Sequence, residues 1–264
     1  MKTDKLVEEL INSYGDWFND ESSYNSGKMT KNLYPYTSIF EPIDINRMTI
    51  KNRLVMAPMG NIAMSDETGR PKDQMIQYFV ERAKGGVGLI TTGLIPISQG
   101  VDPTVVEPGG LSYFPRIDRS RSVFAGWRDL ASGVHSHGAK IFIQLTPGLG
   151  RVGNPQCLLT LKKFPKSASW NPNFYIPQIP STRLSNRGLR RIIKNAGQAS
   201  ADAKASKIDG VYLHGHEGYL LEQLTNPAFN RRKMGRYSDW QAFGLDMIRE
   251  IRNRVGPHYP IMYR

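Results

Sequence analysis

The stretch HGHEGYLLEQL, residues 214–224, places two histidines, a glutamate and a tyrosine within six residues. All four side chains can take part in proton transfer, because imidazole, carboxylate and phenol groups each donate or accept protons. They directly follow the apolar run GVYL, residues 210–213, which is typical of a buried strand. The spacing therefore indicates proton-transfer chemistry at the end of a strand, at His214, His216, Glu217 and Tyr219.

The elements that would position these residues alternate along the chain. Short strand-like runs occupy residues 37–60, and further strands are predicted at 87–93, 139–148, 209–215 and 259–264. Helical periodicity separates them at residues 72–84, 122–138, 189–206 and 240–255. Two long connections, 94–120 and the residues up to Asn186, read as loops. Such alternation with continuous apolar strands is typical of parallel strands joined by helical crossovers.

Two architectures fit this alternation, a doubly wound open sheet and a (β/α)8 barrel. The glycine-rich fingerprint that would follow the first strand of a nucleotide-binding open sheet is absent, and APMGNIAMSDETGR stands there instead. Residues with binding or catalytic chemistry come at the ends of several strands: Pro58, Met59, Gly93, Gln144, His214 and Arg264. In a barrel these ends converge on one face. We predict a (β/α)8 barrel of which about the first five units are present, in a fragment or truncated chain.

Composition limits the class of protein. No apolar run is long enough to span a bilayer, the N-terminus lacks secretory features, and we expect the protein in the cytoplasm. Cys157 is the only cysteine, so the 264 residues hold no multi-cysteine metal site. The net charge of +12 includes a basic concentration between Lys162 and Lys194. It is interpreted as solvated surface, with a groove for phosphate or carboxylate ligands as the alternative and nucleic acid disfavoured.

Five motifs together resemble the FMN-binding barrel of the old yellow enzyme family. They are TIKNRLVMAPM, YFVERAKGGVGLITTG, IFIQLTPGLGR, DGVYLHGHEGYLLEQL and NRR, in the order of the first five barrel strands. Within the family they are most similar to the branch of 2,4-dienoyl-CoA reductase, enoate reductase and the bile-acid-inducible ene-reductases. The resemblance covers residues 36–264 as the barrel domain, and residues 1–35 are expected to form a helical extension and linker.

The resemblance implies a cofactor, a reaction and a set of roles. FMN would bind to Ala57, Pro58, Met59, Gly60, Gly93, Gln144 and Arg264, and NAD(P)H would be the electron donor. Hydride would pass from flavin N5 to the β-carbon of an α,β-unsaturated carbonyl compound, and Tyr219 would protonate the α-carbon. Many relatives place two donors after the fourth strand to bind the carbonyl oxygen. Here the second position is Glu217, so His214 or His216 would share that role.

The same resemblance leaves several points open. The substrate is an enoate, a dienoyl-CoA or a steroid or bile-acid enone, and a homo-oligomer is compatible with the family. No resident metal ion is expected, and a 4Fe-4S cluster and FAD are expected only in a longer parent chain. The alternatives are a non-catalytic half-barrel remnant and a different barrel enzyme. A different barrel enzyme would need a lysine or paired carboxylates at the strand ends, and the predicted strand ends lack both.

Overall fold

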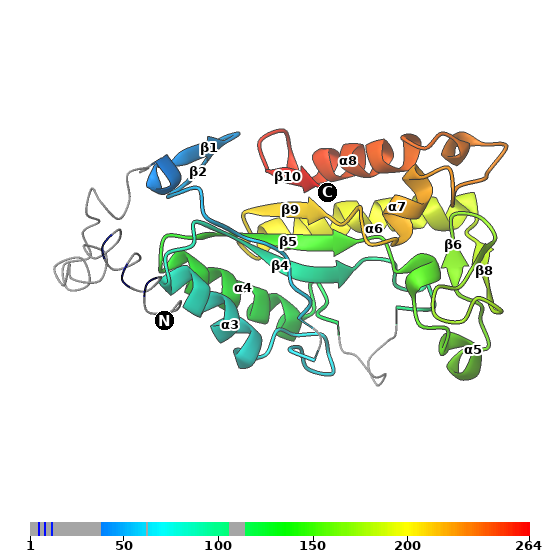
Figure 1. Cartoon of the computed structure of the whole chain (residues 1–264), viewed down its shortest axis with the longest axis horizontal. Coiled ribbons are helices and arrows are strands. Elements are labelled where there is room, and N and C mark those ends of the chain that lie inside the picture. The colour runs from blue at the N-terminus through cyan, green and yellow to red at the C-terminus, as the bar shows by residue number, and fades with distance from the viewer. Residues whose placement is uncertain (1–4, 6–7, 9–11, 13–37, 62, 106–113) are drawn as a thin grey trace. The chain divides into compact units, whose positions relative to one another are not determined.

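The computed structural model describes residues 38–61, 63–105 and 114–264, together with Lys5, Glu8 and Asn12 (Figure 1). Backbone contacts divide the chain into two compact units, Met1–Glu41 and Pro42–Arg264. The first contains the short 3-10 helix η1 (Ser38–Phe40). Apart from those three single residues, the helical extension and linker predicted for residues 1–35 lie outside the described residues, as does the boundary predicted at residue 36.

Five parallel strands form the central sheet of the second unit, each beside the one before it in the chain (Figure 1). A doubly wound sheet reverses its strand order at a switch point, whereas a barrel adds strands in sequence. The order seen is therefore that of a barrel, and the open-sheet alternative is wrong. The strands are β3 (Val55–Met56), β4 (Leu89–Pro96), β5 (Lys140–Thr146), β9 (Gly210–Leu213) and β10 (Ile261–Tyr263).

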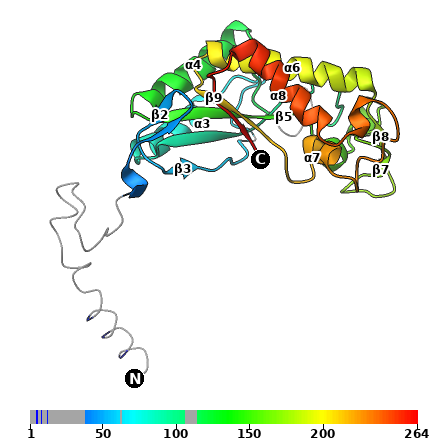
Figure 2. The same cartoon turned by 90° about the horizontal axis from the view of Figure 1, so that it is seen from above.

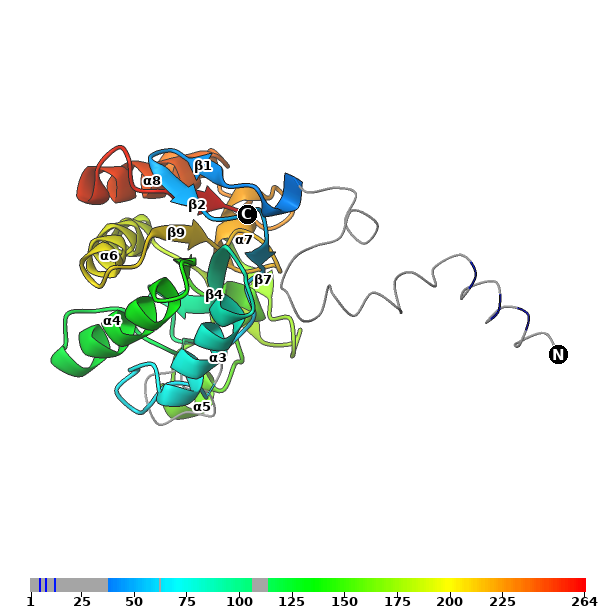
Figure 3. The same ribbon diagram turned by 90° about the vertical axis from the view of Figure 1, so that its left-hand side faces the viewer.

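Four long helices connect these strands: α3 (Asp73–Lys84), α4 (Arg121–His135), α6 (Asn186–Ala205) and α8 (Ala242–Val255). Helices α4, α6 and α8 form a layer on one face of the sheet (Figures 2 and 3), and α3 packs beside α4. Each buries an apolar stripe, such as Met75, Ile76 and Phe79 in α3. Helix α8 begins two residues after the predicted Trp240. The Asp239 side chain accepts a hydrogen bond from Gln241 N (2.9 Å), which forms a turn before the helix starts.

Alternation along the strands sorts side chains between two environments. In β5, Ile141 and Ile143 pack in the large core shared with the helices. Phe142 points to the opposite face, in a small cluster with Leu89 and Ile50. The hairpin of β1 (Ile43–Ile45) and β2 (Met48–Ile50) supplies Ile50 to that cluster. Gln144 lies two residues beyond Phe142, so it belongs to the same face of the sheet.

The predicted strand ends need a correction for two residues. Gly93 and Gln144 lie inside β4 and β5, which continue to Pro96 and Thr146. The register between the two strands shifts between Thr91 and Leu94. This irregularity interrupts regular pairing at Gly93, as is common next to active sites.

The connection after β5 also differs from the predicted loop. It contains the 3-10 helix η2 (Gly150–Val152), helix α5 (Cys157–Thr160) and a three-stranded sheet of β6 (Lys166–Ser167), β7 (Asn171–Pro172) and β8 (Pro180–Arg183). A further helix that the sequence did not indicate, α7 (Leu220–Thr225), follows the loop after β9, and η3 (Arg236–Ser238) precedes α8. In the described part of the chain, no helix combines the length and apolarity needed to cross a membrane.

Candidate active site

The loop between β9 and α7 brings the two predicted histidines and the glutamate into contact. The Nδ1 atoms of His214 and His216 lie 3.2 Å apart. Carboxylate oxygens of Glu217 lie 3.5 Å from Nε2 of each ring. The turn depends on two successive residues with left-handed backbone, Glu217 (φ 64°) and Gly218 (φ 71°). A non-glycine residue in this region is uncommon and is found often at functional sites.

Burial controls the protonation of His214, whose side chain is only 2% exposed. Desolvation lowers its pKa from 6.5 to about 4, and the positive charges of His216 and Arg264 act in the same direction. His214 is therefore neutral at neutral pH, with one ring N–H and one lone pair. In the contact between the two Nδ1 atoms, one ring donates its N–H and the other accepts, and either histidine can be the donor.

This low pKa predicts acid sensitivity. Because unfolded His214 would titrate near 6.5, the unfolded state binds more protons than the folded state between about pH 4 and 6.5. The free energy of unfolding should fall as the pH decreases through that range, by roughly 3 kcal/mol from this residue. Urea titrations at several pH values should show a flatter dependence in His214→Asn. His258→Asn, the same change at an exposed position, is the matched control. Equal slopes in the wild type and in His214→Asn would contradict the assignment.

Tyr219 lies at the start of α7 and faces the same cluster. Its ring centroid is 4.9 Å from that of His214. Burial raises the pKa of the Tyr219 phenol, and the nearby Glu217 and Tyr175 add to this effect. The hydroxyl therefore keeps its proton at neutral pH, as a general acid must.

Two residues that the sequence analysis did not single out hold this loop, the buried Gln223 and the half-buried Glu222. Gln223 is fully buried, donates to Gly218 O (2.6 Å) and accepts from Ser167 Oγ (2.8 Å). Glu222 accepts from Gly218 N (2.6 Å). The turn before Tyr219 is thus fixed by its own helix and by the connection after β5. A polar residue inside the apolar run LLEQL is the only sequence signal for Gln223.

Gln144 supplies an unsatisfied donor on the same face of the sheet. It is 2% exposed, and its Nε2 has no hydrogen-bond partner among the described residues. Leaving a buried amide donor unpaired costs about 1–3 kcal/mol, so the position calls for an acceptor. Tyr212 pairs with Gln144 across the strands, and His214 comes two residues later. The pyrimidine edge of a flavin, which carries carbonyl and imino groups, fits this donor.

The segment Ala57–Gly60 packs directly against Gly93. A Cβ atom on Gly93 would lie 2.1 Å from Met59 O, so the absence of a side chain admits the backbone of this segment. Asn61, also missed from the sequence, accepts from Gly93 N (2.9 Å) and ties the two together. Met59 remains 59% exposed and a Cβ on Gly60 would meet nothing within 4 Å, so the segment presents an open surface.

Arg264 comes next to the histidine loop at the end of β10. Its backbone N–H donates to Leu213 O (3.2 Å), and a Cβ atom on Gly215 would lie 2.1 Å from Arg264 O. Its positive charge contributes to the lowered pKa of His214. The structure thus gathers Tyr219, His214, His216, Glu217 and Arg264 in one place. The ligand atoms of the two histidines and Glu217 lie within 4.8 Å of one another, close enough for a cation as well as for proton exchange.

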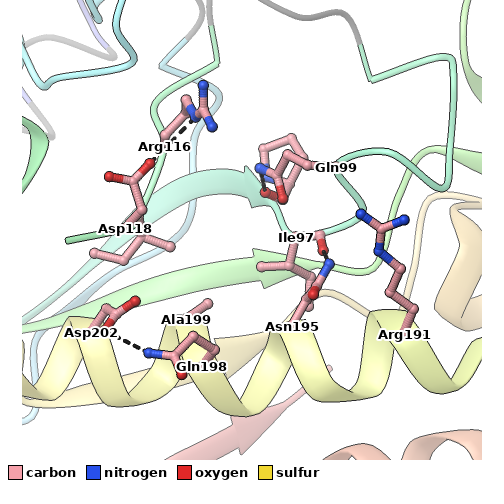
Figure 4. Close-up of a pocket in the computed structure, with 11 residues that line it drawn as sticks. Ile97, Gln99, Arg116, Asp118, Arg191, Asn195, Gln198, Ala199 and Asp202 are labelled. Carbon is pink, nitrogen blue, oxygen red and sulfur yellow. Dashed lines mark hydrogen bonds and ion pairs between the residues drawn. The ribbon is translucent and has the colours of Figure 1, made fainter. Parts of the chain in front are cut away.

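A pocket of about 240 Å³ lies elsewhere, between the segment after β4 and helix α6 (Figure 4). Two of its amide side chains are bonded within the protein: Asn195 donates to Ile97 O (2.8 Å) and Gln198 to Asp202 (2.9 Å). None of the site residues predicted from the sequence lines it.

A family model described as NADH:flavin oxidoreductase / NADH oxidase matches residues 38–264. Cinnamate reductase of Clostridium sporogenes is 32% identical over 87% of this chain and 34% of its own length. The chain thus spans about a third of that relative.

Two solved structures share the fold. The old yellow enzyme homologue of Zymomonas mobilis is 23% identical, with a TM-score of 0.71 over 86% of this chain and 62% of its own. The 2-naphthoyl-CoA reductase in complex with 2-naphthoyl-CoA is 21% identical, with a TM-score of 0.73 over 87% of this chain and 35% of its own. Both likenesses agree with the strand order of a (β/α)8 barrel of which five strands are present.

Proposed function

Because the chain belongs to the NADH:flavin oxidoreductase / NADH oxidase family, we propose that it forms the first part of an FMN-dependent ene-reductase. The observation that carries the proposal is the buried Nε2 of Gln144, which has no hydrogen-bond partner among the described residues. Gln144 pairs with Tyr212 in the strand that leads into the loop of His214 and Tyr219. An acceptor atom on the flavin ring would satisfy this amide. The proton-transfer residues follow in the loop directly after the neighbouring strand β9. Further electron-carrying domains with 4Fe-4S and FAD belong to the proposal only for a longer polypeptide.

In this proposal the chain's own residues hold the flavin on three sides. The backbone of Ala57–Gly60, fixed by Gly93, lies along the ring, and Gln144 binds its pyrimidine edge. Arg264 provides a positive charge, which stabilises an anionic ring. When bound, FMN supplies hydride from N5 to the β-carbon of the substrate after reduction by NAD(P)H.

The histidine loop acts on the substrate carbonyl. His216 is 26% exposed whereas His214 is 2% exposed, so His216 is the accessible donor to the carbonyl oxygen. His214 orients it through the 3.2 Å contact between their Nδ1 atoms, and Glu217 holds both rings. Tyr219 donates its phenolic proton to the α-carbon. A donor at the oxygen stabilises negative charge as it develops there.

The substrate proposed is an α,β-unsaturated carbonyl compound. The name of the cinnamate reductase relative supports an enoate with an aromatic substituent. An acyl-CoA thioester is the second candidate substrate, because one structural neighbour is a complex with 2-naphthoyl-CoA. Reduction of cinnamate compared with cinnamoyl-CoA by the full polypeptide will separate the two.

The cofactor assignment is tested by Gln144→Ala and Arg264→Ala in the full polypeptide. Loss of one neutral hydrogen bond is worth about 0.5–1.5 kcal/mol, so Gln144→Ala should weaken FMN binding about 2- to 10-fold. Arg264→Ala should lower the flavin reduction potential, because the reduced anion loses a nearby positive charge. Flavin fluorescence during dialysis and redox titration measure the two effects.

Unchanged affinity and unchanged potential in both variants would reject the flavin contacts. A full polypeptide that carries no flavin and does not oxidise NADH in the presence of an enone would favour the half-barrel remnant instead.

A further inference from the structure

A second pocket, of about 440 Å³, is lined mainly by cationic side chains. It lies between the small sheet that follows β5 and the segment that follows α7. Its lining contains no acidic residue and consists of Ser169, Trp170, Arg183, Arg231, Arg232, Lys233 and Met234. We call this set the basic pocket. Its volume lies within the range of about 300–1,000 Å³ typical of small-molecule sites.

The buried member of the basic pocket, Arg232, lacks an anionic partner among the described residues. Only 9% of it is exposed, and its guanidinium donates to Ala168 O (2.8 Å), to Asn186 Oδ1 (3.0 Å) and to Leu184 O. All three acceptors are neutral. Burial, with the charge of Arg183 beside it, lowers the pKa of Arg232 to about 10, so it is still cationic at neutral pH. A buried charge with only neutral partners is costly, and an anion would offset that cost.

The other three cations divide into one that is fixed and two that are available. Arg231 is held by Ala228 O (2.6 Å) and by Trp170 O. Arg183 and Lys233 are exposed, and neither side chain makes a hydrogen bond or ion pair within the described chain. A rigid pair of guanidinium groups beside two free cations suits a ligand with more than one negative charge.

Trp170 adds a surface for a flat ring. It is 62% exposed, and Met234 beside it in the basic pocket is 84% exposed. Aromatic side chains next to cations are a recurring surface for stacked bases, worth about 1–3 kcal/mol per base. We propose that the basic pocket binds the adenosine diphosphate part of a nucleotide, with the phosphates between Arg183 and Lys233 and the base against Trp170. This inference is independent of the flavin site and of the proposed reduction.

Binding is tested on the full polypeptide with ADP, pyrophosphate and adenosine as probes, by calorimetry. We expect ADP to bind more tightly than pyrophosphate, and adenosine to bind weakest. Arg183→Glu and Lys233→Glu should each weaken ADP at least tenfold. Trp170→Phe should weaken ADP without changing pyrophosphate. Lys163→Glu, the same change at an exposed position outside the basic pocket, is the matched control, and circular dichroism checks that each variant folds.

The proposal would be overturned by the absence of saturable ADP binding, or by an equal loss of affinity in Lys163→Glu and Arg183→Glu. Competition then identifies the source of the shared ADP group. Displacement of ADP by NADH alone would assign a dinucleotide, and displacement by free coenzyme A alone would assign an acyl carrier. Displacement by both would support the shared group as the element recognised, and displacement by neither would reject it.

Discussion

Replacing Tyr219 with phenylalanine is expected to slow oxidation of the reduced flavin by an enone about 10²- to 10⁴-fold, the usual contribution of a general acid. The phenol lies beside His214 at a ring distance of 4.9 Å, and its raised pKa keeps it protonated. The variant removes only the hydroxyl, so FMN content and the rate of flavin reduction by NADH should be unchanged. Stopped-flow absorbance of the two half-reactions separates these effects.

A nitro-olefin provides the control for this prediction. Its product anion is stable without protonation, so the Tyr219→Phe variant should reduce it at nearly the wild-type rate. Wild-type rates with the enone would show that Tyr219 is not the acid and would shift that role to His214 or His216. An equal slowing with both substrates would point to misplaced substrate rather than to a missing proton.

The fold was predictable where local pattern and tertiary structure agree. The apolar runs around Phe142 and Val211 form β5 and β9, because both faces of these strands are buried. The extension of β4 to Pro96 was not predictable, because proline is rare inside a central strand. The shift in register beside Gly93 also has no signal in the local sequence. Strands of two to four residues, such as β6 and β8, are too short to show any periodicity.

The candidate site divides in the same way. Residue type was enough to single out His214, His216, Glu217 and Tyr219, because four proton-transfer side chains rarely occur within six residues. Their common environment depends on a left-handed turn at Glu217, which the following Gly218 hints at but does not establish. Gln223 has no local signal of its role, because its hydrogen bonds reach residues such as Ser167, 56 positions away in the sequence. Long-range partners of this kind are set by the fold.

Gly93→Ala should destabilise the barrel and also weaken the proposed flavin binding. Alanine for glycine normally raises stability by about 0.4–1 kcal/mol where the backbone conformation permits it, by restricting the unfolded chain. Gly93 is outside the left-handed region, so its backbone would accept alanine. Its new methyl, however, would lie 2.1 Å from Met59 O and 2.9 Å from Asn61 N, both backbone atoms. Overpacking of this kind costs about 1–3 kcal/mol, so the net change should be a loss.

The sign of the change in the free energy of unfolding therefore shows whether overpacking outweighs the restriction of the unfolded chain. Urea titration of Gly93→Ala should give a lower free energy of unfolding, and FMN should dissociate more readily because the Ala57–Gly60 segment moves. Gly60→Ala is the matched control: a Cβ there meets nothing within 4 Å, so stability should stay the same or rise. If Gly93→Ala were as stable as wild type while still losing FMN, the glycine would serve the ring directly. A stable variant with normal FMN affinity would show that the close approach of Met59 to β4 does not shape the site.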